Sequence, residues 1–320
     1  MNKLKIIKPL IIGLGVAGKR HLEAQLKLGF QTGVYSLNFK KTDPIGKQDN
    51  VIIFDNLEEA IEWSNLVHVC TPDDKHTEYV AMALKKGKAV LCEKSFTTNL
   101  EDALFLQKLA HKYNCLLIIG QNYRLTPTFA EIKKRVLVGD LGTIKKIETT
   151  YLHDRLQYQQ RAPLRKNQDF LYIAGSHAVD LACWIADEEI VNIKASSENI
   201  LNYQISIKFS SGIMGSIKLD AISSRPVNGT DLIVGGDKGK LVSHNKLDKL
   251  LFYEIGNRKP RSTKFLNTQT HTTALEVKII DDYLLGKRNS YWPIPNVDEA
   301  INTIKILDAV EKTVSKIICQ

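Results

Sequence analysis

The sequence predicts an α/β protein: an N-terminal doubly wound parallel sheet of the Rossmann type, then an α+β domain with an open, mostly antiparallel sheet. Residues 1–124 alternate short apolar runs with amphipathic helical patterns, which is typical of βαβ units. Residues 125–320 instead carry strand-like runs separated by glycine-containing turns, which favours antiparallel neighbours. A chain of 320 residues is long enough for both domains.

In the first domain, the apolar runs and the helical patterns follow one another regularly. Asn56 and Asn99 precede two helical patterns as caps, and Gly29 and Gly87 follow two others. We expect strands at residues 10–13, 33–36, 51–54, 66–70, 89–92 and 115–119, and helices at 17–28, 57–64, 76–86 and 100–113.

In the second domain, a helix at residues 127–138 is stopped by Gly139, and strand-like runs follow. A terminal amphipathic helix spans 298–318, and helices are expected on one face of the sheet. The strands are predicted at 143–151, 190–196, 200–209, 213–221, 232–234 and 240–243, with turns at Ser211-Gly212, Asn228-Gly229 and Gly235-Gly236.

The composition is that of a globular protein, with one unusual figure, a formal charge of +9. Hydrophobic residues make up 43% and charged residues 25%, which excludes disordered, collagen-like and polytopic membrane classes. The excess positive charge is evenly spread, because residues 1–124 hold 17 Lys and Arg against 13 Asp and Glu, and the rest 27 against 22. With no basic tail or recognisable binding module, we expect no nucleic-acid partner.

The five cysteines have no metal-type spacing and indicate free thiols in a reducing compartment. No stretch reaches the roughly 18 uninterrupted apolar residues of a membrane span. Pro9 and three glycines break the apolar run near the N-terminus, which argues against a signal peptide. We therefore expect a cytoplasmic protein without a metal site or membrane association.

A glycine-rich loop, Gly13-Leu14-Gly15-Val16-Ala17-Gly18, lies between the first predicted strand and the first predicted helix. The first glycine permits a tight turn, the second lets the backbone approach a pyrophosphate, and the third lets the helix pack on the strand. The N–H groups and the dipole at the helix start attract the anion. In this context the motif predicts dinucleotide binding, whereas the alternative is a plain strand-to-helix turn.

The end of the second predicted strand lacks the acid that holds the ribose 2′-hydroxyl in NAD-binding units. This segment reads Val34-Tyr35-Ser36-Leu37-Asn38-Phe39-Lys40-Lys41. A hydroxyl at Ser36 and the amines of Lys40 and Lys41 suit a 2′-phosphate, which a carboxylate would repel. The sequence therefore favours NADP over NAD, although NAD stays possible and a solvated lysine pair is the alternative.

Two more segments are predicted at the carboxyl ends of later strands, where doubly wound sheets bind ligands. Thr71-Pro72-Asp73-Asp74-Lys75-His76 could cap a cofactor, and Glu93-Lys94-Ser95 brings a lysine to the same edge. A lysine amine can act as acid and base if desolvation and a cationic nicotinamide lower its pKa from about 10.4 toward neutrality. A surface Glu-Lys pair is the structural alternative.

Six motifs, in order along nearly the whole chain, are similar to those of the Gfo/Idh/MocA oxidoreductases. The resemblance implies a nicotinamide-dependent enzyme whose C-terminal open sheet forms the oligomer interface, as a homodimer or homotetramer. The motifs are G-L-G-V-A-G-K-R-H (13–21), T-P-D-D-K-H (71–76), G-K-A-V-L-C-E-K (87–94), N-Y-R-L-T-P (122–127), G-D-L-G-T-I (139–144) and G-S-H-A-V-D (175–180).

The resemblance also implies roles for individual residues. Lys94 would bind the reacting hydroxyl and shuttle its proton, and His177 would assist it. We expect substrate contacts from Tyr123, Arg124, Arg155, Tyr172 and His177. We expect cofactor contacts from Gly13, Gly15, Val16, Ala17, Gly18, Ser36, Lys40, Lys41, Cys70, Thr71, Pro72, His76, Glu93, Lys94 and Gln121.

His177 and Asp180 are three residues apart at the start of a predicted helix over 178–185, so the carboxylate could steady the imidazole. The family usually places an aspartate four residues before this histidine, where this chain has Ile173. An apolar side chain can neither accept a proton nor bind a hydroxyl. Candidates to replace it are Asp154, Asp169 and Tyr172.

The family also usually writes E-K-P with a cis proline, whereas this chain has Ser95. Since non-proline cis bonds are rare, we expect a trans Lys94–Ser95 bond and a displaced Lys94.

The leading hypothesis is an NADP(H)-dependent oxidoreductase acting at a carbinol or keto carbon of a sugar, a cyclitol or a nucleotide-sugar. Arg155, Arg161 and Arg165 could bind a substrate phosphate, or form a solvated loop. One alternative is a biliverdin-reductase-like enzyme of another substrate class, against which Lys94 argues. The other, motivated by Ser95 and Ile173, is an NAD(P)-binding regulatory protein with altered catalysis.

Overall fold

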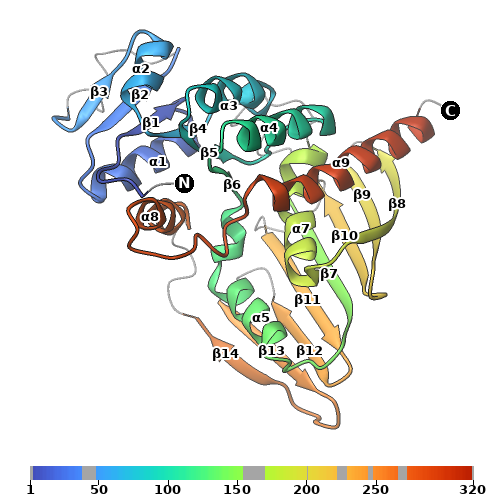
Figure 1. Cartoon of the computed structure of the whole chain (residues 1–320). Coiled ribbons are helices and arrows are strands. Elements are labelled where there is room, and N and C mark those ends of the chain that lie inside the picture. The colour runs from blue at the N-terminus through green and yellow to red at the C-terminus, as the bar shows by residue number, and fades with distance from the viewer. Residues whose placement is uncertain are drawn as a thin grey trace. The chain divides into compact units, whose positions relative to one another are not determined.

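The structure is a computed structural model that describes residues 3–37, 48–153, 170–199, 201–221, 229–243, 248–265 and 272–318. The chain divides into two compact units (Figure 1). Unit 1 comprises residues 1–122 and 271–304, and unit 2 comprises 123–270 and 305–320. The sequence predicts one division after residue 124, whereas residues 271–304 group with unit 1.

Unit 1 contains a sheet of six parallel strands in the order β3-β2-β1-β4-β5-β6, which confirms the predicted doubly wound fold. The order reverses between β1 and β4, and such a switch point is where these sheets bind ligands. Every residue of β1, β4, β5 and β6 is buried, as expected for strands covered on both faces. The strands are β1 (Pro9–Ile12), β2 (Thr32–Tyr35), β3 (Val51–Ile53), β4 (Leu66–Val69), β5 (Ala89–Glu93) and β6 (Leu117–Gly120).

The four helices predicted between these strands are present, with ends within two residues of the prediction. Asn56 caps α2 by accepting a hydrogen bond from the Glu59 N–H (3.1 Å), and Asn99 caps α4 by accepting one from the Asp102 N–H (2.8 Å). The helices are α1 (Val16–Lys27), α2 (Leu57–Trp63), α3 (His76–Lys85) and α4 (Leu100–Lys112).

Residues 271–304 join unit 1 through direct packing. They contain α8 (Thr273–Leu284), which packs on α1. Gln25 of α1 donates a hydrogen bond to Asp281 of α8 (3.3 Å), and the Ile119 N–H donates to the Pro295 carbonyl (3.0 Å). These contacts connect segments far apart in the sequence, which position along the chain does not predict.

Unit 2 contains eight strands in the order β14-β13-β12-β11-β7-β10-β9-β8. Only the β7–β10 pair is parallel among the described strands, so the predicted mostly antiparallel sheet is confirmed. β13 and β14 at one edge are not predicted by the sequence. The strands are β7 (Ile144–Leu152), β8 (Ile190–Asn199), β9 (Asn202–Phe209), β10 (Met214–Asp220), β11 (Gly229–Gly236), β12 (Gly239–Ser243), β13 (Lys249–Glu254) and β14 (Arg261–Lys264).

One face of this sheet is covered by helices and the other bears polar side chains. Along β9, buried and exposed residues alternate. α7 (Phe170–Ala186) packs on β7 and β10, and a Cβ at Gly175 would lie 2.6 Å from Leu307 of α9 (Val297–Ile318). α5 (Pro127–Leu137) completes the unit. An oligomer formed through this sheet stays a prediction.

The turn predicted at Gly235-Gly236 lies two residues further on. β11 continues through Gly236, and the chain bends at Asp237 and Lys238 before β12. A Cβ at Gly236 would lie 2.2 Å from the Leu141 carbonyl oxygen. Glycine is therefore required here because two backbone segments pack closely. In the sequence, a glycine required for close packing looks the same as a glycine required for a turn.

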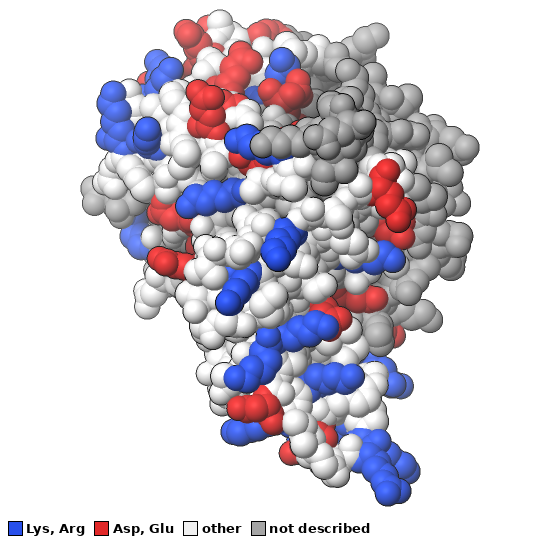
Figure 2. Space-filling view, turned by 90° about the vertical axis from the view of Figure 1, so that its right-hand side faces the viewer, with Lys and Arg blue, Asp and Glu red and all other residues white. Residues whose placement is uncertain are grey.

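Several expectations from the composition concern the surface charge, the cysteines, membrane spans and metal sites. On the face in Figure 2, lysine and arginine side chains lie singly or in short rows, with acidic side chains among them. Cys70, Cys92, Cys115 and Cys183 are free thiols. Within the described ranges, we find no helix with the length and apolar character of a membrane span, and no cluster of metal-ligating side chains. The cytoplasmic location stays a prediction.

Candidate active site

The glycine loop joins β1 to α1 in a conformation that only glycine fits. Gly13 has φ +90°, and a Cβ there would lie 2.9 Å from the Cys70 carbonyl oxygen. A Cβ at Gly18 would lie 1.9 Å from the Gly13 carbonyl oxygen, so this glycine allows α1 to pack against the turn. Gly15, in contrast, has no described atom other than those of its own chain neighbours within 4 Å of its Cβ position. The open space at Gly15 suits a ligand that approaches the backbone at the start of the helix.

We expect alanine at Gly18 and at Gly15 to have different effects. Gly18→Ala should lower the free energy of unfolding by about 1 to 3 kcal/mol, because the methyl group meets backbone that cannot move aside. Gly15→Ala should leave that free energy unchanged within about 1 kcal/mol but weaken dinucleotide binding. Urea unfolding and cofactor titration measure the two effects. Unchanged cofactor affinity in Gly15→Ala would argue against this loop as the pyrophosphate site.

The end of β2 lies next to the glycine loop, because the Gly13 N–H donates to the Tyr35 carbonyl (2.9 Å). Ser36 follows at once, so the hydroxyl predicted to bind a 2′-phosphate is at the expected edge of the sheet. Lys40 and Lys41 lie outside the described residues. Among the described residues, the predicted preference for NADP over NAD therefore rests on Ser36. It also rests on the absence of an acidic residue from the sequence of residues 34–41.

His76 ties together two loops at the carboxyl edge. Its Nε2 lies 3.0 Å from the Thr71 carbonyl oxygen and its Nδ1 lies 2.8 Å from that of Ser95. The ring is buried. His76 thus supports the loops after β4 and β5, while its predicted direct contact with the cofactor stays a prediction.

The remaining predicted cofactor residues lie along the same edge. The Cys70 N–H donates to the Ile12 carbonyl (2.9 Å), which joins the ends of β4 and β1. The half-buried Thr71 and the exposed Pro72 follow. Gln121 is buried just after β6. The parallel sheet therefore gathers these segments, although they are far apart in the sequence.

β5 ends at Glu93, and the half-buried Lys94 follows it at this edge. The Lys94–Ser95 peptide bond is cis, so the expected trans bond is wrong. Backbone groups on both sides of this bond make hydrogen bonds. The Ser95 carbonyl lies against the His76 ring, and the Lys94 N–H donates to Glu93 Oε2 (3.1 Å).

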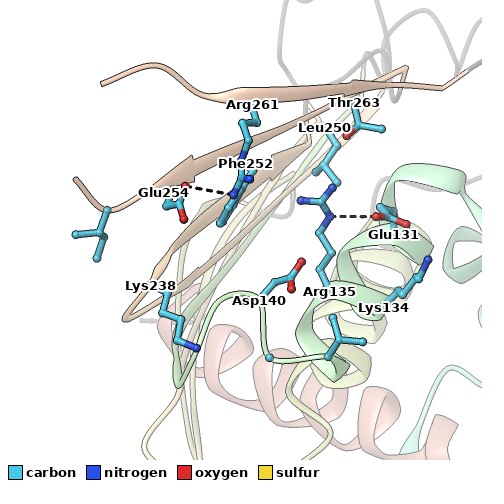
Figure 3. A pocket seen from close by; sticks show the side chains of 13 residues that line it. Glu131, Lys134, Arg135, Asp140, Lys238, Leu250, Phe252, Glu254, Arg261 and Thr263 are labelled. Atoms are coloured by element: carbon cyan, nitrogen blue, oxygen red, sulfur yellow. Dashed lines mark hydrogen bonds and ion pairs between the residues drawn. The ribbon is translucent and has the colours of Figure 1, made fainter. Parts of the chain in front are cut away.

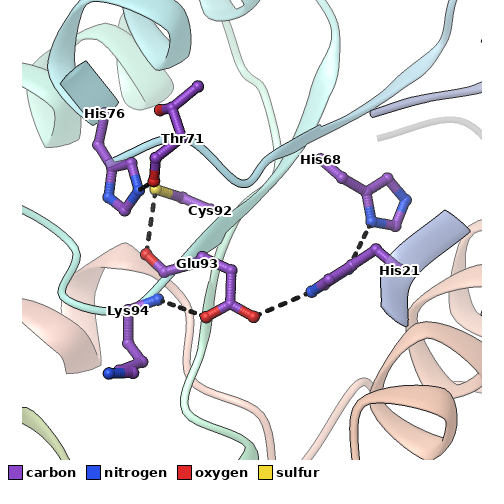
Figure 4. Close-up of polar contacts among 7 residues, drawn as sticks. All are labelled: His21, His68, Thr71, His76, Cys92, Glu93 and Lys94. Carbon is purple, nitrogen blue, oxygen red and sulfur yellow. Dashed lines mark hydrogen bonds and ion pairs between the residues drawn. The ribbon is translucent and has the colours of Figure 1, made fainter. Parts of the chain in front are cut away.

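The Glu93 carboxylate connects this loop to buried histidines (Figure 4). Glu93 Oε1 lies 3.0 Å from Nε2 of His21 on α1. Burial raises the pKa of Glu93, but the hydrogen bond and charge of His21, with the charges of Lys94 and His76, outweigh it and lower the pKa below its ordinary value. Figure 4 shows the Lys94 side chain extending away from the carboxylate. Glu93 thus holds the backbone of Lys94 rather than its amine.

In unit 2, His177 lies within α7 and stacks on Tyr123. The two ring centroids are 4.0 Å apart with an interplanar angle of 12°. The Tyr151 ring is parallel to His177 at 6.2 Å. Burial raises the pKa of Tyr123, and a hydrogen bond to Tyr151 partly offsets it. His177 is therefore held within an aromatic stack.

The structure places Arg124 and Tyr172 in the interior of unit 2. Arg124 Nε and Nη2 donate to the two oxygens of Asp180 (2.9 and 2.8 Å), and both side chains are almost fully buried. The Tyr172 hydroxyl donates to Glu311 (2.9 Å). These partners favour structural roles over the predicted substrate contacts. The predicted pairing of Asp180 with His177 stays a prediction.

Sequence reasoning missed Tyr151 and His153 at the end of β7. Their rings are parallel at 6.2 Å, and His153 lies 6.5 Å from the ring of Phe170. The signal was present, because an aromatic and a histidine two residues apart share one face of a strand. α7 also begins at Phe170, well before the predicted helix start. Asp154, Arg155, Arg161, Arg165 and Asp169 lie outside the described residues.

Unit 2 also contains a polar hollow of about 980 Å³ between α5 and the strands β13 and β14 (Figure 3). Four of its charged groups form two ion pairs, Arg135 with Glu131 at 3.0 Å and Arg261 with Glu254 at 3.2 Å. Among the predicted site residues within the described ranges, none lines it. We assign the hollow no part in the candidate site.

Comparison with known families decides the class of this protein. Residues 7–121 match the family described as "Oxidoreductase family, NAD-binding Rossmann fold", and residues 129–242 match the "GFO/IDH/MocA C-terminal domain". The chain belongs to the Gfo/Idh/MocA oxidoreductase family. The resemblance inferred from the six motifs is therefore confirmed, and so is the NAD-binding type of the first fold.

Curated relatives of the chain differ in how much of it they match. The chain is 36% identical over 138 residues to an uncharacterized oxidoreductase of Schizosaccharomyces pombe, and the match covers 42% of this chain and 38% of that protein. It is 26% identical over 294 residues to a myo-inositol 2-dehydrogenase of Thermotoga maritima, covering 83% and 84%. A third relative, glucose-6-phosphate 3-dehydrogenase of Bacillus subtilis, is 26% identical over 189 residues, covering 57% of this chain and 54% of that protein. The chain thus spans only 38% of the Schizosaccharomyces pombe protein and 54% of the Bacillus subtilis protein.

A solved structure has the same fold over nearly the whole chain. Levoglucosan dehydrogenase, in complex with NADH and levoglucosan, matches with a TM-score of 0.84, covering 97% of each chain at 18% identity. At this identity the likeness establishes the fold alone.

Proposed function

We propose that the protein is an NADP(H)-dependent oxidoreductase that transfers a hydride to or from a carbinol or keto carbon of a sugar, a cyclitol or a nucleotide-sugar. One observation carries this proposal: the glycine cradle after β1 and Lys94 after β5 lie at the same edge of one parallel sheet. Membership of an oxidoreductase family supports the reaction type. Relatives and neighbours named for inositol and levoglucosan support the substrate class.

The residues of the two units have separate tasks in this proposal. When bound, the nicotinamide supplies or accepts the hydride. Lys94 accepts the proton of the hydroxyl as it is oxidised and returns it in the reverse direction. His177, oriented by Tyr123, donates a hydrogen bond to the substrate oxygen. Arg124 and Tyr172 hold the helix that carries His177.

A steady-state assay tests this function directly. Cyclitols, hexoses and nucleotide-sugars are offered with NADP and with NAD, and their keto forms with NADPH and NADH. Turnover with at least one polyol or keto-sugar supports the proposal. Cofactor binding with no turnover across the panel would contradict it.

We expect NADPH to bind more tightly than NADH. The 2′-phosphate meets Ser36 and no acid at the end of β2, so a charge-assisted contact replaces the repulsion a carboxylate would cause. A preference of about tenfold corresponds to roughly 1.4 kcal/mol. Titration of cofactor fluorescence measures both dissociation constants, and Ser36→Asp should reverse the order. Equal or tighter binding of NADH to the unaltered protein would contradict the NADP assignment.

A second candidate function is an NAD(P)-binding regulatory protein. The observation that favours it is Ile173, a buried apolar residue in α7 where the family usually has an aspartate. Measurable binding of NADPH, together with no oxidation of the bound NADPH by any keto-sugar, would favour this second function.

A further inference from the structure

A chain of buried polar side chains runs through unit 1 from Glu93, at the end of β5, to Asp281 on α8, and lies outside the glycine cradle. Glu93 Oε1 lies 3.0 Å from His21 Nε2, and His21 Nδ1 lies 3.0 Å from His68 Nδ1. His68 Nε2 lies 3.1 Å from Gln25 Nε2, and Gln25 Nε2 donates to Asp281 Oδ1 (3.3 Å). His21, His68 and Gln25 are 0% exposed.

With neutral rings, these contacts allow one arrangement of protons. The Gln25 amide nitrogen, which faces His68 Nε2, can only donate, so His68 Nε2 accepts and His68 Nδ1 carries the proton. His68 Nδ1–H then donates to His21 Nδ1, which leaves the proton of His21 on Nε2, directed at Glu93. Burial lowers the pKa of His68 well below its ordinary value, which agrees with a neutral His68.

The Glu93 carboxylate is therefore held between two donors, His21 Nε2–H on Oε1 and the Lys94 N–H on Oε2. A carboxylate that accepts two hydrogen bonds is favoured in its ionised form, in agreement with the lowered pKa of Glu93. The other titratable groups that face Glu93 are Lys94 beside it, His76 on α3, Cys70 after β4, Cys92 on β5 and Glu276 on α8.

We propose that the buried pair His21–His68 fixes the ionised carboxylate of Glu93, which thereby positions the backbone of Lys94 and maintains a negative charge on the residue that precedes it. The inference rests on the proposed function of Lys94. His21, His68 and Glu93 are positioning residues, since they act through the backbone and the charge that Lys94 experiences. A nearby negative charge stabilises the protonated amine, so its loss lets Lys94 deprotonate at lower pH.

The proton arrangement can be tested without any activity. In the full-length protein labelled with ¹⁵N-histidine, NMR correlations of the ring nitrogens identify each tautomer. We expect His21 to carry its proton on Nε2 and His68 on Nδ1. The opposite tautomer at His21, or a doubly protonated His68 at neutral pH, would overturn the proposal.

Variants at His21 test the consequence for Lys94. His21→Leu removes the donor to Glu93, and we expect kcat to fall by about tenfold to a hundredfold with little change in KM or in the Kd for NADPH. The limb of the kcat/KM pH profile that depends on Lys94 should move to lower pH by about one unit. His21→Gln, which can still donate to Glu93, should restore most of kcat and most of the original position of the pH limb. His111→Leu, at an exposed histidine on α4, is the matched control and should change neither kcat nor the pH profile.

The failures of the two proposals are distinguishable. If Lys94→Ala abolishes turnover but His21→Leu retains the unaltered pH profile and kcat, the positioning role is wrong and the function of Lys94 stands. If Lys94→Ala retains turnover, the function of Lys94 is wrong and the positioning role falls with it, whatever the tautomers are. If His21→Leu does not fold, Glu93→Gln gives the same test, because the isosteric amide removes the charge together with one of the two acceptor oxygens and should produce the same shift to lower pH.

Discussion

Replacing Lys94 with alanine is expected to lower kcat by about 10²- to 10⁴-fold, the range that a positioned acid or base contributes. Lys94 follows β5 at the carboxyl edge of the sheet, and its backbone is held by Glu93. Its amine is the group proposed to move the proton of the substrate hydroxyl. Because the side chain is not part of the glycine cradle, the Kd for NADPH should stay within a few-fold. Steady-state kinetics and cofactor titration measure the two quantities.

A matched control for this variant is Lys85→Ala, at an exposed lysine on α3 of the same unit. It removes the same charge and should leave both kcat and cofactor affinity unchanged. Full turnover by Lys94→Ala with a confirmed substrate would show that another group transfers the proton.

Asp180→Ala is expected to destabilise the protein by about 3 to 5 kcal/mol, the loss typical of a buried ion pair deprived of one partner. Both oxygens of Asp180 bind Arg124, and the two side chains are 1% and 2% exposed. Removing the carboxylate leaves the guanidinium charge buried beneath the Trp184 ring, at 5.6 Å from its centroid. Urea unfolding monitored by tryptophan fluorescence measures the loss.

Glu254→Ala provides the comparison, since Glu254 pairs with Arg261 at the surface of the same unit. Exposed pairs of this kind contribute about 0 to 1 kcal/mol. Equal effects of the two variants would show that burial of the Arg124–Asp180 pair is unimportant. An unchanged free energy of unfolding in Asp180→Ala would contradict the structural role assigned to Arg124.

The fold could be predicted from the sequence wherever a local pattern determined an element. The buried strands of unit 1 read as apolar runs, and Asn56 and Asn99 marked helix starts that the structure confirms. β14, with the sequence R-S-T-K, has no apolar pattern, because an exposed edge strand needs none. The grouping of α8 with unit 1 depends on contacts such as Gln25 with Asp281, which no local pattern encodes.

The candidate site could be predicted where a motif carries its own physical reason. The crowding at Gly13 and Gly18 is what the spacing of the loop implies. The pairing of Asp180 with Arg124 could not be predicted, because helix spacing suggested only that Asp180 shares a face with His177. His68 gave no signal, since a histidine inside the apolar run of β4 is indistinguishable from an isolated interior group. Its role depends on the partner that α1 brings to it.

The most direct test of the central claim is isotope transfer in a single turnover. The protein is loaded with NADPH deuterated at the transferable position of the nicotinamide and mixed with a panel of keto-sugars and keto-cyclitols. Mass spectrometry then locates the label. We predict deuterium on a carbinol carbon of a reduced sugar or cyclitol, and loss of this transfer in Lys94→Ala. Bound NADPH that stays unconsumed across the whole panel would contradict an oxidoreductase of this substrate class.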